Sequence, residues 1–446
     1  MPADPRLRAQ IQLILDTHQD AAVFPDDWEE PGNVGYIYRE NVILSGGQDV
    51  TRVIESIDVS FPREEETGQA SRYEVSRASG GIQRISLRGL PPVPAVLDAL
   101  DAELGTGVAT IDAFLYPCPY PCPATEPVEV PPGTLAPFPP PDSCEPCRHP
   151  GQPGGRAGCD GDGVSVSVVD TGLLPDAAAG HPWLAGVTGT AEDPYFPGTD
   201  QIRPYAGHGT FAAGCLRCTA PKAQVFVAKG FDSGTGQFES DLTPVLEGAL
   251  DRHPDIFVFT FVSATRKDLS LKTFDDLYER RIRHVKGLVV IAPAGNDGKS
   301  RWMWPAACPW VVSVGALSAS WRDRAHFSNH GGWVDVYAPG EDLVNAFAHG
   351  SYICDEPPAG EHRHFRGMAR WSGTSFSAPV FAGLVAARMS ATGENGQRAA
   401  ASLLRLARGQ AVRGIGAVLY PGQACLRGEE ACLPAASLPA RPCGCR

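Results

Sequence analysis

The chain has 446 residues, 43% of them hydrophobic, which is enough to build a large core and more than one domain. Its 38 lysine and arginine residues are outnumbered by 51 aspartate and glutamate residues, so the net charge is −13. This acidic balance argues against a nucleic-acid partner, which requires a basic face, and no apolar run has the length of a membrane span. We therefore expect neither a nucleic acid nor a membrane as partner.

The first twenty residues hold one short apolar patch at positions 11–15, which Gln12 interrupts and Asp16 ends. A secretory signal peptide has a longer apolar centre followed by small residues, so we interpret the segment as an amphipathic helix and expect a cytoplasmic protein. The thirteen cysteines favour the alternative, a secreted protein with disulfides. Their odd number leaves at least one thiol unpaired in a monomer.

Residues 1–116 are interpreted as a small α+β domain. Strand-like and helix-like segments follow one another in the order β-α-β-β-α-β, which is typical of a ferredoxin-like fold. The segments are 34–44, 48–57, 71–75, 82–87, 94–104 and 108–116.

Residues 117–157 are rich in proline and are predicted to form an extended linker. The segment carries Cys118, Cys122, Cys144 and Cys147. Their spacing is compatible with zinc, but the prolines do not provide the framework of a zinc ribbon, so we favour disulfides or free thiols.

Residues 158–416 alternate between buried strands and helices, which predicts an α/β domain with a parallel sheet covered by helices. Ser240 is a candidate N-cap of one helix, and a long charged helix is expected over 268–287. Functional loops in such sheets gather at the carboxyl ends of the strands. The tail, 417–446, carries Cys425, Cys432, Cys443 and Cys445 and is expected to pack or cross-link onto this domain.

Three polar residues stand where an α/β fold places catalytic groups. Asp170 ends a valine-rich strand in VVDTG, where it can orient a histidine and stabilise its imidazolium form. His208, in AGHGT, stands among small residues that let a helix begin against a close neighbour. Asn296, in APAGN, follows a strand and can offer its side-chain N–H₂ to an oxyanion. Taken singly, each has an ordinary alternative: a helix cap, a structural histidine and a turn asparagine.

Ser375 lies in SGTSFSAPVFAG, just before or inside the first turn of a buried helix. The free N–H groups and the positive end of the helix dipole favour a developing anion there. A serine is a poor nucleophile by itself, so catalysis needs a base, an orienting acid and an oxyanion donor. Without them, Ser375 would be an ordinary N-cap.

The order of VVDTG, GHGT, AGN, FSNHGGWVDVYAPG and SGTSFSAP resembles the subtilisin-like serine proteases, the subtilases, from residue 161 to 416. The resemblance implies a subtilisin-like, mostly parallel sheet flanked by helices and a serine endopeptidase that acts on polypeptides. It implies Asp170 as orienting acid, His208 as general base and then acid, and Ser375 as nucleophile. Asn296 and the backbone N–H of Ser375 would form the oxyanion hole. The chemistry requires no cofactor, and a structural calcium ion is left open.

The chain departs from the family pattern at several positions. Phe211 stands where a second histidine often follows GHGT, and Phe376 follows the nucleophile where methionine is usual. Neither position takes part in proton transfer, so we expect activity to be kept. TFVSAT at 260–265 replaces the Ser-Leu-Gly of the substrate-lining strand, and Pro293 interrupts a run of alanines beside the specificity pocket. Substrate preference is therefore not carried over.

The resemblance also implies that residues 1–116 are a propeptide-like domain, because many subtilases carry a small ferredoxin-like prodomain. Such a domain would be an intramolecular inhibitor of the peptidase. Cys215 and Cys218, one turn apart on the histidine's helix, are interpreted as buried thiols rather than as a disulfide or redox switch.

Two alternatives stand beside this function. Asp170-Thr171-Gly172 and Asp232-Ser233-Gly234 both fit the signature of an aspartic protease, but that enzyme brings two such loops together from duplicated all-β halves. The second alternative is a catalytically silent subtilase-fold binding module, which would usually have lost a catalytic residue.

Overall fold

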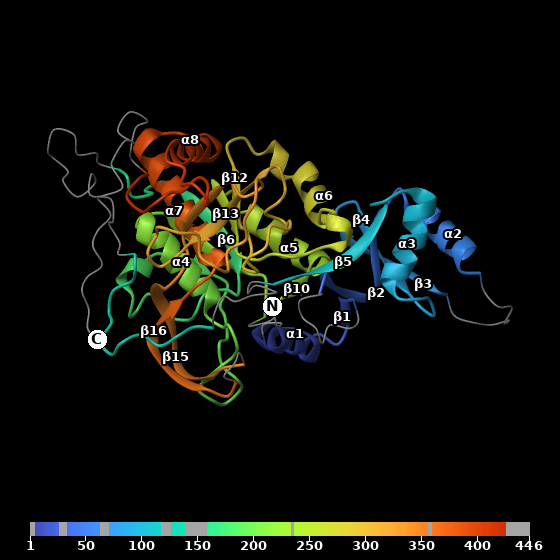
Figure 1. Ribbon diagram of the computed structural model, residues 1–446, viewed down its shortest axis with the longest axis horizontal. Helices are drawn as coiled ribbons and strands as arrows, with labels where there is room; N and C mark the ends of the chain where they lie inside the picture. The colour runs from blue at the N-terminus through green and yellow to red at the C-terminus, as the bar shows by residue number, and fades with distance from the viewer. Residues whose placement is uncertain are drawn as a thin grey trace.

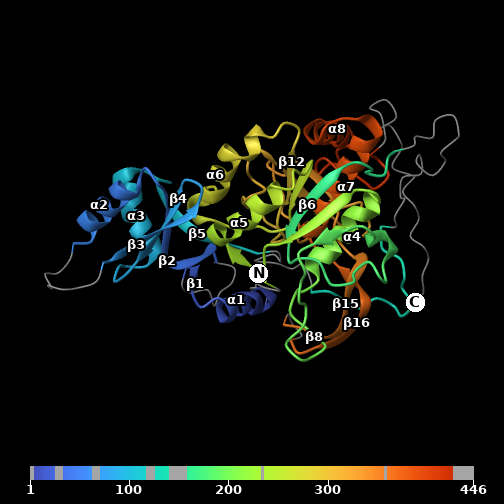
Figure 2. The ribbon, with the colours of Figure 1, turned by 180° about the vertical axis from the view of Figure 1, so that it is seen from behind.

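The computed structural model describes residues 5–25, 34–62, 71–116, 126–139, 158–232, 236–355 and 359–424. Figures 1 and 2 show a small α+β layer at one end of the molecule, packed on a larger α/β body. Its parallel sheet with helices on both faces confirms the predicted α/β class.

The N-terminal part is an antiparallel sheet with strand order β5-β2-β4-β3 and two helices, α2 and α3, on its outer face (Figure 1). This is the arrangement expected of the β-α-β-β-α-β order. The elements of this part are α1 (Pro5–Thr17), β1 (Ala21–Phe24), β2 (Tyr36–Gly46), α2 (Val50–Ser60), β3 (Tyr73–Ser79), β4 (Ile82–Leu87), α3 (Val93–Leu104) and β5 (Ala109–Leu115).

The body is built on a seven-stranded parallel sheet with the order β14-β13-β12-β11-β6-β9-β7. Its central strands are buried on both faces, which explains their nearly continuous apolar sequence. The strands are β6 (Ser165–Asp170), β7 (Thr188–Gly189), β9 (Gln224–Lys229), β11 (Ile256–Phe259), β12 (Val289–Pro293), β13 (Val311–Leu317) and β14 (Val336–Pro339).

Helices cover both faces of the sheet and divide the core in two. Val166 and Val168 of β6 face the core beneath α4, α7 and α8, whereas Val169 faces the core beneath α5 and α6. This second core is continuous with that of the N-terminal part. The helices are α4 (His208–Thr219), α5 (Glu239–Leu250), α6 (Lys272–Arg280), α7 (Thr374–Thr392) and α8 (Gly396–Gly409), with short 3₁₀ turns η3 (Pro182–Leu184), η4 (Arg266–Asp268) and η5 (Ile282–His284).

The sequence analysis did not identify a long hairpin, which Figure 2 shows extending from the body. It consists of β15 (Leu343–Ile353) and β16 (His362–Trp371), and β8 (Gln201–Ile202) pairs with β15. Its strands carry histidines and arginines among buried residues, so they lack a clean alternating pattern. The described part of the proline-rich segment, 126–139, lies along this hairpin through the bridges Val128–Arg370 and Phe138–Val344.

Two local expectations are corrected. The charged helix expected over 268–287 is shorter, because α6 spans only Lys272–Arg280 between two 3₁₀ turns. Ser240 is not an N-cap, since α5 begins one residue earlier, at Glu239. The backbone N–H of Ser240 instead donates to the carboxylate of Asp112, 3.1 Å away on β5. The first turn of α5 is therefore capped by the N-terminal part, which local sequence does not reveal.

Candidate active site

Asp170 and His208 meet where β6 ends and α4 begins. Asp170 is the last residue of the central strand β6, and His208 is the first residue of α4; both are buried. Nδ1 of His208 lies 2.9 Å from each carboxylate oxygen of Asp170. An N–H at Nδ1 donates to this acid, which leaves Nε2 as the nitrogen that can accept a proton.

The backbone around this pair is held by short local bonds. The N–H of Thr171 donates to Oδ1 of Asp170 over 2.6 Å, and the N–H of Gly209 donates to the hydroxyl of Thr171 over 3.0 Å. The end of β6 and the start of α4 are thus bonded to each other beside the hydrogen bond between Asp170 and His208. Gly209 has no room for a side chain, because a Cβ there would lie 2.4 Å from the carbonyl oxygen of Gly172.

Aromatic rings enclose the imidazole of His208. The ring of Trp371 meets it edge-on at 5.2 Å, and the ring of Phe376 lies 4.8 Å away. Phe211 packs behind them, 5.7 Å from Trp371. These rings exclude water from the imidazole, and water exclusion strengthens its interaction with Asp170.

Ser375 is the second residue of α7, immediately after the turn at Gly373, and it is buried. The next residue, Phe376, contacts the ring of His208, so the start of α7 lies beside the Asp170–His208 pair. The sequence-predicted position of the serine at a buried helix start agrees with this placement. Backbone N–H groups at a helix start point out of the helix, which favours an anion beside it.

Asn296 follows β12 and is tied to the same helix start. Its Oδ1 accepts from the N–H of Thr374 over 2.7 Å, and the hydroxyl of Thr374 accepts from the N–H of Gly295 over 3.1 Å. Because a backbone N–H must meet the amide oxygen, this bond fixes which end of the amide is Nδ2. Nδ2 lies 3.7 Å from the position that a Cβ on Gly373 would take, beside the turn that precedes the serine.

The sequence analysis missed Glu192, whose side chain lies behind the Asp170–Gly172 turn. Its Oε1 accepts from the N–H of Gly207 over 3.0 Å. Burial raises the pKa of Glu192 to about 8, and the charge of Asp170 raises it as well. In sequence Glu192 looks like its neighbour Asp193, yet its exposed fraction is 1%, whereas that of the Asp193 side chain is 72%. Nothing in the local pattern distinguishes the two.

Asp232, from the second segment that fits the aspartic-protease signature, does not meet Asp170 from the first. Asp232 pairs with Lys229 over 2.7 Å, and its side chain is 88% exposed, whereas Asp170 is fully buried against His208. Ser233 and Gly234 lie outside the described residues. An aspartic protease needs two carboxylates that share a proton, and these two carboxylates have different partners.

Cys215 and Cys218 are free, buried thiols, as expected. Burial raises the pKa of both and brings that of Cys218 to about 12, so neither thiol is reactive at neutral pH. The predicted cysteines of the linker and the tail lie outside the described residues. Within the described ranges, no group of three or more histidine, cysteine, aspartate or glutamate residues could hold a metal ion, and no helix is long and apolar enough to cross a membrane.

Comparison with known proteins agrees with the sequence pattern. The model of the subtilase family matches residues 161–408, more than half of the chain. Subtilisin-like protease 2 of Arthroderma otae is 31% identical over 246 residues, which cover 52% of this chain and 50% of that protein. Subtilisin-like protease 2 of Trichophyton verrucosum is 31% identical over 248 residues, which cover 52% and 51%. The chain thus spans about half the length of these relatives.

A solved structure extends the likeness in fold to most of the chain. Fervidolysin from Fervidobacterium pennivorans, described as a keratinolytic enzyme related to subtilisin, aligns with a TM-score of 0.54 and 18% identity. The alignment covers 87% of this chain and 61% of that one. At this identity the likeness concerns the fold alone.

The expected cytoplasmic location is wrong. The fungal relatives are secreted proteases, which points to a secreted protein. The first helix, α1, is amphipathic as expected, with Ile11 and Ile14 buried in the core. Their pattern reflects packing and does not bear on export. Cys159 is disulfide-bonded, which agrees with an oxidising compartment.

Proposed function

This chain belongs to the subtilase family, and we propose that it is a serine endopeptidase that works through Asp170, His208 and Ser375. The observation that carries the proposal is the double contact of His208 Nδ1 with the Asp170 carboxylate at 2.9 Å, beside the helix whose first turn holds the serine. This contact prepares Nε2 to take a proton from a hydroxyl group.

The reaction proceeds through an acyl-enzyme. The Ser375 hydroxyl passes its proton to Nε2 of His208 while its oxygen bonds to the substrate carbonyl carbon. Nδ2 of Asn296 and the N–H of Ser375 donate to the oxyanion that forms. The C–N bond then breaks as His208 gives its proton to the leaving amine, and water releases the acid by the reverse route. No step requires a cofactor.

We further propose that the N-terminal part, residues 1–116, inhibits this site within the chain. Its sheet packs on α5 and α6, and strand β10 (Gln237–Phe238) of the body extends it by pairing with β5 (Figure 1). Tyr116, the last described residue before 126, exchanges two backbone hydrogen bonds of 3.2 Å with Val262. Val262 belongs to the segment that lines the substrate in the family, so the end of this part occupies a place where an extended substrate would pair.

The interface between the two parts is held by buried charges. Asp112 accepts from the hydroxyl of Ser240 over 2.7 Å and from Arg39 over 3.1 Å. Arg39 and Arg84 both pair with Asp241 of α5. Charges buried in pairs make such a contact specific, because removing one partner leaves the other without compensation.

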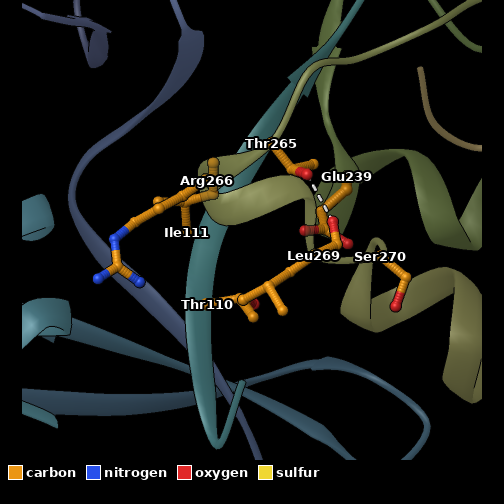
Figure 3. A pocket seen from close by; sticks show the side chains of 7 residues that line it. All are labelled: Thr110, Ile111, Glu239, Thr265, Arg266, Leu269 and Ser270. Atoms are coloured by element: carbon orange, nitrogen blue, oxygen red, sulfur yellow. Dashed lines mark hydrogen bonds between the residues drawn. The ribbon is translucent and has the colours of Figure 1, made fainter. Parts of the chain in front are cut away.

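A pocket at this interface contains the carboxylate of Glu239. Figure 3 shows Thr110 and Ile111 of β5 on one side of it and residues of the body on the other. Glu239 accepts from the hydroxyl of Thr273 over 2.8 Å and from the N–H of Ala113 over 3.5 Å. It therefore contacts the N-terminal part and α6 at once. The pocket is lined by Thr110, Ile111, Glu239, Thr265, Arg266, Leu269 and Ser270.

A fluorophosphonate probe tests the catalytic proposal. We expect the purified chain, once it has been cleaved between 116 and 126 and freed of residues 1–116, to be labelled on Ser375 and to hydrolyse casein. Ser375→Ala should remain folded while losing both properties. Ser377→Ala is the matched control, since Ser377 is also buried in α7 and its hydroxyl has no partner among the described residues. A chain that is neither labelled nor active after this cleavage would instead be a binding module with a subtilase fold.

A further inference from the structure

Glu192 is a buried carboxyl group that the proposed mechanism leaves without a role. It lies beyond the end of β6 and is joined to its neighbours through both its backbone and its side chain. Its N–H donates to the carbonyl of Leu173 over 2.9 Å, and its Cβ lies 3.3 Å from the position that a Cβ on Gly172 would take. The side chain therefore packs directly against the turn that carries Asp170.

The Oε1 atom of Glu192 reaches the other half of the catalytic pair. It accepts from the N–H of Gly207, which immediately precedes His208 and caps α4. Gly207 has φ +83°, a left-handed conformation that glycine adopts without strain, and a Cβ there would lie 3.0 Å from the ring of Phe347. Its N–H is buried, so the Glu192 oxygen supplies the partner that water cannot.

The charges around Glu192 disfavour a second carboxylate. The charge of Asp170, which faces His208, raises the pKa of Glu192. The cation on this side, Lys229, pairs with Asp232. Lys229 and the hydroxyl of Thr171 both lower the pKa of Glu192, but burial outweighs them. Oε2 of Glu192 has no hydrogen-bonding partner among the described residues. A buried carboxylate without a cation is costly, and a protonated one is much less so.

We propose that Glu192 is a positioning residue of the catalytic site, which acts as a neutral carboxylic acid that holds the start of α4 through Gly207 and leaves Asp170 as the one negative charge facing His208. This inference rests on the proposed peptidase function and adds a residue to it. Glu192 acts only through the backbone and the electrostatics of its neighbours.

The neutral state leads to a test by substitution. Glu192→Gln keeps an oxygen for the N–H of Gly207 and carries no charge at any pH, whereas Glu192→Leu keeps the approximate shape and removes the acceptor. Asp193→Asn is the matched control on the exposed neighbour. The rate of fluorophosphonate labelling is measured from pH 5 to 9 on the chain cleaved between 116 and 126 and freed of residues 1–116, together with kcat and KM for casein and the thermal midpoint.

We expect Glu192→Gln to be labelled within about twofold of the parent at pH 7, with the acid limb of its pH profile unmoved. If Glu192 is neutral in the pH range of the acid limb, its replacement by glutamine removes no charge beside His208, so the limb does not move. Glu192→Leu is expected to lose about tenfold or more in labelling rate and in kcat, with little change in KM, because the histidine is displaced.

An acid limb that moves to lower pH in Glu192→Gln would overturn the proposal, since it would reveal a charged Glu192 that had been stabilising the imidazolium form. Parental labelling by a folded Glu192→Leu would overturn it as well. If Glu192→Leu does not fold, the comparison of Glu192→Gln with the parent still decides the matter. A parent chain that is not labelled after removal of residues 1–116 would refute the peptidase function itself.

Discussion

The ring of Phe211 lies 4.5 Å from the ring of Phe376, so two positions at which this chain departs from the pattern of its family are in contact with each other. One ring belongs to the helix that begins at His208 and the other to the helix that begins at Thr374, one residue before Ser375. Both also contact Trp371. The two departures therefore form one packing unit behind the imidazole.

The first prediction concerns this unit. Phe376→Met and Phe211→His, which restore the residues usual in the family, should each reduce the free energy of unfolding, and their effects should not add. We expect a coupling of about 0.5–1.5 kcal/mol, because each substitution alone already disrupts the contact between the rings of Phe211 and Phe376. Denaturant unfolding of the two single variants and the double variant measures this value. Phe327→Leu, in a separate core cluster, should combine additively with either substitution.

The second prediction concerns Asn296. Asn296→Ala should lower kcat by roughly 10²–10³, the range known for such a donor in subtilisin, with little change in KM, because the amide acts mainly on the oxyanion. Steady-state kinetics with casein measures both constants. Asn395→Ala, which removes the side-chain cap of α8, should lower stability but not kcat. A rise confined to KM would assign Asn296 to substrate binding instead.

The third prediction concerns the contact between Asp112 and α5. Asp112→Ala should weaken inhibition of the peptidase by separately added residues 1–116 by about 30-fold or more, since it leaves Arg39 and the first turn of α5 without this buried partner. The inhibition constant is measured against the remainder of the chain, 126–446. Asp58→Ala, on an exposed acid of α2, is the control. Equal inhibition by the Asp112 variant would contradict the inhibitory role of this interface.

The fourth prediction concerns the pH dependence of the same inhibition. Burial in the interface raises the pKa of Glu239 from its ordinary value, 4.5, to about 8, and the charge of Asp112 adds to the effect. Docking of residues 1–116 then requires proton uptake between these two values. The stabilisation of the docked state by protonated Glu239 is complete below pH 4.5 and is lost as the pH rises toward 8. The inhibition constant should therefore rise by up to about tenfold per pH unit between these values.

Glu239→Gln in the peptidase provides the control for this dependence. It keeps a hydrogen-bonding side chain at the interface and cannot ionise, so its inhibition constant should change less steeply with pH than that of the parent. The same slope in both proteins would show that another group takes up the proton.

The fifth prediction concerns residues 126–139. Glu126 is buried and accepts from the hydroxyl of Tyr352 over 2.9 Å, and the bridges of Val128 and Phe138 bind the segment to β15 and β16. A peptidase that begins at 126 should therefore have a higher thermal midpoint than one that begins at 158. Equal midpoints would show that the segment contributes no stability.

The local sequence predicted where each candidate catalytic residue lies within its own strand or helix. Asp170 and Asn296 fall at strand ends, and His208 and Ser375 fall at helix starts, because apolar runs, small residues and glycines impose these conformations on a few neighbouring residues. The α/β alternation and the order of the N-terminal elements follow from the same periodicities.

The tertiary structure alone decided which distant groups these segments meet. Glu192 and Asp193 are adjacent acids, and only the packing of β6 and α4 buries the first and leaves the second in water. Likewise, Asp112 caps α5 from another part of the chain, and Asn296 is oriented by an N–H of α7. Burial and the partners of a polar group depend on segments far away in sequence, so no local pattern encodes them.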